Sequence, residues 1–173
     1  MMKIKSRARA FSLVELVIVV VIIGVIAAIA VPRISRGAKG AGESALRGSL
    51  ASLRNSIDMY AAEHNGAWPG TPENTEAKLI EHLTKKTSVS GEVGTTAGTH
   101  IYGPYLRGGF PPAPVGPNMG ATGVIMTTTT PIAGAADEAE TTMGWVYNYQ
   151  IGEIIVNTED ATKDEKARSY NTY

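Results

Sequence analysis

The chain has 173 residues, with 16 basic and 16 acidic side chains and no cysteine. The first ten residues hold four positive charges and no acid, which leaves 12 basic against 16 acidic side chains from Phe11 onward. A mildly acidic body argues against nucleic acid as the main partner. The lack of cysteine excludes disulfides, thiol catalysis and zinc sites built on thiolates.

The first element is an apolar run over residues 11–31, in which every residue except Ser12, Glu15 and Gly24 is Phe, Leu, Val, Ile or Ala. A helix of this length spans about 30 Å, the thickness of the hydrocarbon layer of a bilayer. The positive charges before the run favour a cytoplasmic N-terminus. The sequence therefore predicts a single membrane-spanning helix, with the rest of the chain on the outward side.

Glu15 needs an explanation, because a carboxylate in the middle of a membrane helix costs about 2.5–3.5 kcal/mol, and somewhat less near an end. The run is open to interpretation as a cleaved secretory signal peptide or as a plain one-pass anchor. A third interpretation is that the chain is cut between Ala10 and Phe11. The ammonium group freed on Phe11 then pairs with Glu15 of a neighbouring copy, and only this interpretation provides the carboxylate with a partner.

The stretch RARAFSLVELVIVVVIIGVIAAIAVPRI resembles the type IV pilin and type II secretion pseudopilin superfamily, and most of all a major (G-type) pseudopilin. Members have a short basic leader, Phe at the first mature position, Glu at the fifth and Pro near the twenty-second. Counted from Phe11, Glu15 is fifth and Pro32 is twenty-second. The departure is Ala10, which stands where the family usually has Gly before the cut.

The resemblance implies that prepilin peptidase removes the leader before Phe11 and that the new amine is methylated. Copies then assemble into a helical filament in which Phe11 and Glu15 set the register, while Gly24 and Pro32 weaken the helix. It also implies an inner-membrane assembly platform and minor pseudopilins as partners. The precursor is expected in the bacterial inner membrane, as a single-pass protein with a cytoplasmic N-terminus and a periplasmic head.

Past Pro32, a glycine-rich stretch over residues 33–48 leaves two alternatives, a flexible linker or a soft continuation of the helix. From Leu46 onward, apolar residues recur in steps of three and four, which predicts one buried face of an α-helix. The pair Asn65–Gly66 supplies a cap and predicts the end of the helix.

The remaining elements belong to a head. We expect a short helix over 71–86 with Thr71 as its N-cap, and an ordered Pro- and Gly-rich loop over 87–123. A strand follows over 123–130, and a hairpin lies in GWVYNYQIGEIIVNT. The loop is expected to be anchored by Tyr102, Tyr105 and Phe110, and the hairpin to turn Trp145, Tyr147 and Tyr149 towards the Leu46–Ile57 face of the long helix.

No enzyme motif is present, because His64, His82 and His100 lack ligand spacing and no phosphate loop, Gly-x-Ser-x-Gly or His-Glu-x-x-His occurs. No catalytic residue and no cofactor is therefore predicted. Major pseudopilins bind calcium in an acidic C-terminal loop, and the resemblance leaves calcium open. A solvated charged tail is the favoured interpretation of the matching cluster, Glu159, Asp160, Asp164 and Glu165.

These observations predict an α+β protein whose long N-terminal α-helix packs its second half on a small antiparallel β-sheet. The expected parts are a leader (1–10), a transmembrane and filament-core helix (11–32), an amphipathic helix (33–65) and a head (66–173). The expected function is a structural subunit of a type II secretion pseudopilus. Two alternatives stay open: a type IV pilin of a surface pilus for adhesion, motility or DNA uptake, and a monomeric membrane-anchored binding domain.

Overall fold

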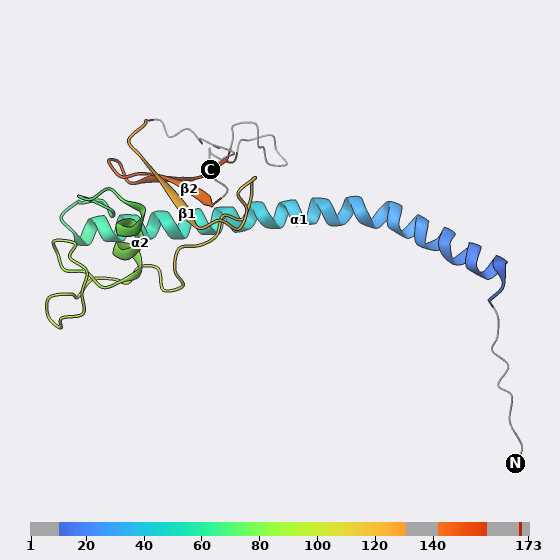
Figure 1. Ribbon diagram of the computed structural model, residues 1–173, viewed down its shortest axis with the longest axis horizontal. Helices are drawn as coiled ribbons and strands as arrows, with labels where there is room; N and C mark the ends of the chain where they lie inside the picture. Colours follow the sequence, from blue (N-terminus) through green and yellow to red (C-terminus); the bar gives the residue numbers. More distant parts are fainter. Residues whose placement is uncertain (1–10, 131–141, 159–169, 171–173) are drawn as a thin grey trace, which may run out of the picture. The chain divides into compact units, whose positions relative to one another are not determined.

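The computed structural model describes residues 11–130, 142–158 and 170. Its elements, in chain order, are α1 (Leu13–Glu63), α2 (Glu76–Thr84), β1 (Gly123–Thr127), β2 (Met143–Asn148) and β3 (Glu153–Val156) (Figure 1). The chain divides into two compact units, Met1–Ala38 and Lys39–Tyr173. The helices and the small sheet confirm the α+β class.

Helix α1 is 51 residues long and continues through Pro32 and the glycine-rich stretch. The flexible linker over 33–48 is therefore the wrong alternative, and the continuing helix is confirmed. The helix ends as predicted, because Asn65 and Gly66 have positive φ angles of 55° and 82°. The Gly66 N–H donates to the carbonyl of Ala61 at 2.8 Å, which closes the last turn.

The core of the head forms between the second half of α1 and the hairpin. Arg54 of α1 also donates from Nη2 to the carbonyl of Ile154 in β3 at 3.2 Å. The buried face of α1 therefore packs against the aromatic face of the hairpin, as expected. The buried hydrophobic cluster that forms this core includes Leu46, Leu50, Leu53, Ile57 and Tyr60 from α1, and Trp145, Tyr147, Ile154 and Val156 from the strands.

The sheet is mixed, with strand order β1-β2-β3. Strands β2 and β3 form the expected antiparallel hairpin, with Tyr147 opposite Ile154. Strand β1 ends at Thr127 and runs parallel to β2, with Val124 opposite Trp145, so the prediction of an all-antiparallel sheet is wrong. Residues 128–142 separate the two strands, and a connection of about a dozen residues or more is what a parallel pair requires.

Helix α2 is shorter than predicted, and its N-cap is Thr75 in place of Thr71. The Thr75 hydroxyl accepts from the backbone N–H of Lys78 at 3.3 Å. Asn74 has a left-handed φ of 56°, which a continuous helix does not pass through. The Thr71 hydroxyl is engaged elsewhere, because it donates to the carbonyl of Trp68 at 2.7 Å.

The Pro- and Gly-rich loop is ordered, as predicted, over the whole of residues 87–122. Thr87 and Tyr102 exchange two backbone hydrogen bonds of 3.0 and 3.2 Å. The ring of Phe110 is buried and packs edge-on against the ring of Trp145, with 6.5 Å between the ring centroids. The indole N–H of Trp145 donates to the carbonyl of Pro111 at 2.8 Å, so the loop is attached to the sheet by packing and by a hydrogen bond.

The hairpin turn requires glycine at position 152. Gly152 has a φ of 71°, and a Cβ placed there would clash with the ring of Trp68. We expect Gly152→Ala to lower the free energy of unfolding by at least about 2 kcal/mol, through left-handed strain and a clash with the indole.

Urea unfolding of the full chain in detergent, followed by tryptophan fluorescence, measures this loss. Gly108→Ala is the matched control, because no atom lies within 4 Å of a Cβ at that position. An equal effect of the two substitutions would contradict the role assigned to the turn.

Candidate functional site

The first 19 residues of α1, Leu13–Val31, have a mean hydropathy of 3.2, and none of them is buried. By length and composition this segment is able to cross a membrane. Its apolar side chains are exposed around the whole helix, from Val19 at 43% to Leu13 at 78%. A helix with such a surface is stable only when lipid or another protein shields its apolar side chains from water.

Glu15 is the acidic residue in the first turn of α1, and its side chain is exposed. A carboxylate is favoured there, because the free N–H groups of a helix N-terminus carry partial positive charge. Glu15 forms no ion pair within residues 11–130, 142–158 and 170. Any charged partner for it therefore has to come from outside the described part of the chain.

Phe11 lies just before α1 and is 79% exposed, four residues ahead of Glu15. The structure thus places two of the predicted assembly residues at the same end of the apolar helix, Phe11 just before it and Glu15 in its first turn. Ala10, the predicted residue before the cut, lies outside the described residues. The roles of Ala10 and Phe11 in processing, and of Phe11 and Glu15 in assembly, stay predictions.

Gly24 and Pro32 both lie inside α1. Among the described residues, no atom comes within 4 Å of a Cβ built on Gly24, so packing against them does not require a glycine there. Pro32 has no amide hydrogen, so the carbonyl of Ala28 receives no helical hydrogen bond from it. The helix is weakened at these points by sequence, which agrees with their predicted role but does not test it.

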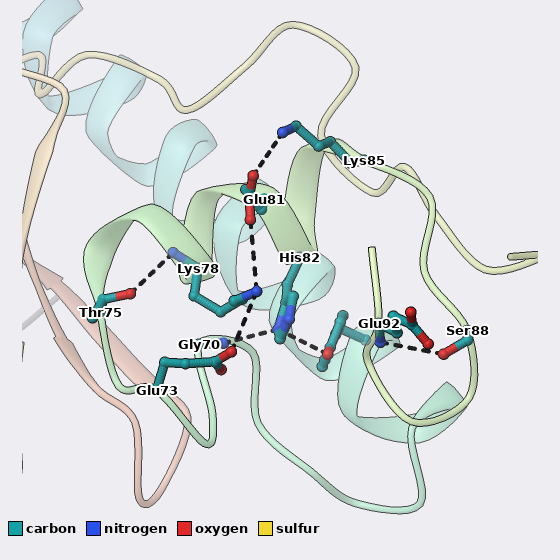
Figure 2. Close-up of polar contacts among 10 residues, drawn as sticks. Gly70, Glu73, Thr75, Lys78, Glu81, His82, Lys85, Ser88 and Glu92 are labelled. Atoms are coloured by element: carbon teal, nitrogen blue, oxygen red, sulfur yellow. Dashed lines mark hydrogen bonds and ion pairs between the residues drawn. The ribbon is translucent and has the colours of Figure 1, made fainter. Parts of the chain in front are cut away.

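The head contains a polar cluster that sequence reasoning missed. The ring of Tyr60 stacks on His64 at 3.8 Å and on His82 at 5.0 Å. His82 Nδ1 lies 3.1 Å from the backbone N of Gly70 (Figure 2). It also lies 2.8 Å from the Tyr60 hydroxyl. Because the Gly70 N–H can only donate, Nδ1 accepts and the ring proton of neutral His82 sits on Nε2.

His64 has the opposite tautomer. Its Nδ1 lies 2.7 Å from the carbonyl of Tyr60, which can only accept, so Nδ1 carries the proton. Nε2 then accepts from the Thr87 hydroxyl at 2.9 Å. The spacing of Tyr60 and His64, four residues apart on one helix face, was the available signal for this stack. His82 arrives from α2, and no local pattern indicated it.

Burial gives the cluster its electrostatic character. Burial, aided by the charge of Lys78, lowers the pKa of His82 to about 4. Burial also raises the pKa of Tyr60 to about 12, with a smaller contribution from Glu73. Both groups are therefore neutral near pH 7, and their hydrogen bond links α1 to α2 without an ionised group on either side.

A cavity of about 450 Å³ borders His82 and is lined mainly by polar side chains. Lys78 Nζ lies 3.4 Å from Glu73 and 3.7 Å from Glu81, which partly neutralises the acids (Figure 2). Within the described part of the chain, no three His, Cys, Asp or Glu side chains are grouped as metal ligands. The acidic tail considered for calcium, which includes Glu159 and Asp160, lies outside the described residues.

The His82 pKa makes the stability of the head depend on pH. Its pKa is about 4 in the folded protein and about 6.5 in the unfolded chain. Between these values the unfolded chain binds a proton that the folded protein excludes. The contribution of neutral His82 to the free energy of unfolding is therefore fully present above about pH 6.5. It decreases as the pH drops towards 4, by up to about 3 kcal/mol in total.

Urea unfolding at several pH values, with wild type and His82→Gln compared, tests this dependence. The difference between the two chains isolates His82, because the carboxylates titrate alike in both. A wild-type slope between pH 6.5 and 4 that matches that of the variant would contradict the assignment.

The family model described as the prokaryotic N-terminal methylation motif matches residues 5–31. The comparisons with curated proteins and with solved structures gave no match. The matched range contains Ala10, Phe11, Glu15 and Gly24 and ends with the apolar segment. The match to this motif supports the resemblance to type IV pilin-like proteins. The apolar helix found among the described residues fits a one-pass membrane anchor.

Proposed function

We propose that the chain is a structural subunit of a helical, pilus-like filament, and specifically of a type II secretion pseudopilus. The observation that carries the proposal is the fully exposed apolar helix Leu13–Val31 with Glu15, unpaired in the described chain, in its first turn. Lipid covers such a helix in the membrane. A bundle of the same helices from other copies covers it in a filament.

The carboxylate gives this assembly a defined register. Burial of an unpaired carboxylate in an apolar bundle is strongly unfavourable, so the bundle needs a cation at that level. Cleavage before Phe11 creates an ammonium group close to the level of Glu15. A pair between Glu15 of one copy and the Phe11 amine of the next fixes the axial offset of the two helices, which apolar contact alone leaves free.

Two features favour the secretion filament over a surface pilus. The chain lacks the cysteine pair common in surface type IV pilins, and its acidic body disfavours DNA uptake. The expected partners are further copies of this chain, minor pseudopilins, the prepilin peptidase and an inner-membrane platform. A surface pilin and a monomeric membrane-anchored domain remain the alternatives. The length and surface exposure of filaments in cells distinguish the two filament classes.

The first test is the chemical state of the mature N-terminus. We expect intact-mass and peptide mass spectrometry of protein from the native membrane to find Phe11 as the first residue, with a methylated amine. Glycine usually precedes the cut in this superfamily, so Ala10→Gly should raise the processed fraction or leave it unchanged. An intact Met1, or a cut near Pro32, would contradict the proposal.

The second test removes the charge of Glu15. We expect Glu15→Ala and the isosteric Glu15→Gln to abolish filaments, seen by electron microscopy, while membrane insertion stays normal. Ser12→Ala is the matched control, because it alters a polar residue one turn away without changing charge, and it should assemble. If Glu15→Ala behaves like wild type, the monomeric anchor is the better account.

A further inference from the structure

We propose that Arg33, together with Arg36, binds phosphate groups of anionic phospholipids at the outward surface of the membrane. The proposal rests on the proposed function in one respect, because it requires Leu13–Val31 to span the membrane before assembly. It adds a second contact to that state, which holds the helix at a fixed depth while the subunit waits to join the filament.

The first argument is position along α1. The apolar segment Leu13–Val31 has 19 residues, and as a helix it rises by about 28 Å, close to the hydrocarbon thickness of about 30 Å. Arg33 follows Val31 by two residues, or about 3 Å of helix. When the segment fills the hydrocarbon layer, the backbone of Arg33 therefore lies where the headgroups begin, within easy reach of lipid phosphates.

The second argument is charge. No acidic residue occurs between Glu15 and Glu43, so the sequence brings no counterion to this turn of the helix. Arg33 is exposed and forms no ion pair or hydrogen bond with the residues that the structure describes. Arg36 adds a second positive charge three residues later in the sequence. A guanidinium group matches the geometry of a phosphate and binds it through two hydrogen bonds.

The third argument is topology. Positive charges on the outward side weaken the orientation signal, which places lysine and arginine on the cytoplasmic side. The four positive residues of the leader have to outweigh Arg33 and Arg36. Two arginines that oppose insertion at this point are explained if the outward headgroup layer binds them once the helix is in place. Acidic side chains of a second copy are the rival partner.

The experiment measures lipid selectivity of the full chain in bilayers of phosphatidylcholine. Trace spin-labelled phosphatidylglycerol or phosphatidylcholine reports, by electron paramagnetic resonance, how strongly each lipid is held at the protein surface. We expect wild type to prefer phosphatidylglycerol. In Arg33→Gln this preference should fall about fivefold. In Arg33→Gln/Arg36→Gln it should fall further. The leader charges are common to all three chains and cancel in the comparison.

The matched control is Lys86→Gln/Arg107→Gln, which removes the same charge from exposed positions in the head and should leave the preference unchanged. The proposal is overturned if the double variant at 33 and 36 binds lipid like wild type, or if the head control loses as much. Loss of filaments in that double variant with unchanged lipid preference would assign the arginines to a neighbouring copy, and also overturns it. Normal filaments without any lipid preference count against this proposal alone.

Discussion

The exposed apolar surface of α1 between Leu13 and Val31 is the constraint on which the whole account depends. Water does not tolerate a helix that is apolar all round, so this segment always needs a cover. Lipid and a bundle of like helices are both suitable covers, because neither asks for polar contacts along the sides of the helix. In the proposed filament, Glu15 distinguishes the two environments, because it would gain a fixed cationic partner only where another chain's terminus lies beside it.

The head is built on the other half of the same helix. Leu46, Leu50, Leu53 and Ile57 are buried against the aromatic face of the hairpin. The stacked rings of His64, Tyr60 and His82 attach α2 and the following loop to the end of α1. One continuous helix therefore carries, in its first half, an apolar surface that no described residue buries and, in its second half, the buried face of the head core. This division suits a subunit whose head folds by itself and whose anchor is completed by its surroundings.

Local patterns in the sequence predicted the parts of the structure that depend on neighbouring residues. Apolar periodicity identified the buried face of α1, Asn65–Gly66 its end, and the alternation of Trp145 and Tyr147 the hairpin. The errors came where distant residues or competing local signals decide the outcome. Thr71 and Thr75 are both plausible caps, and the left-handed Asn74 selects the second. The parallel pairing of β1 with β2 brings together segments that are distant in the sequence, which periodicity does not contain.

The residues of the candidate site also differ in whether the sequence alone could indicate them. Phe11, Glu15, Gly24 and Pro32 were selected because their residue types and spacing match the pattern of the pilin superfamily that the sequence resembles, and their roles stay predictions. The histidine cluster could not be selected in this way, because its members come from α1 and α2 and meet only after the chain folds. The first two histidines had looked unrelated, and the structure shows that burial and two opposite tautomers join them in one hydrogen-bonded stack.

The most direct test of the central claim is a high-resolution electron cryomicroscopy map of the assembled filament. The account predicts that the Glu15 carboxylate lies within about 3 Å of the Phe11 amine of an adjacent copy, the distance of a charge-assisted hydrogen bond. It also predicts that the Leu13–Val31 segments pack side by side in the filament core. A map in which Glu15 faces solvent, or in which the Phe11 amines lie far from it and the apolar helices are spread apart, would contradict the account.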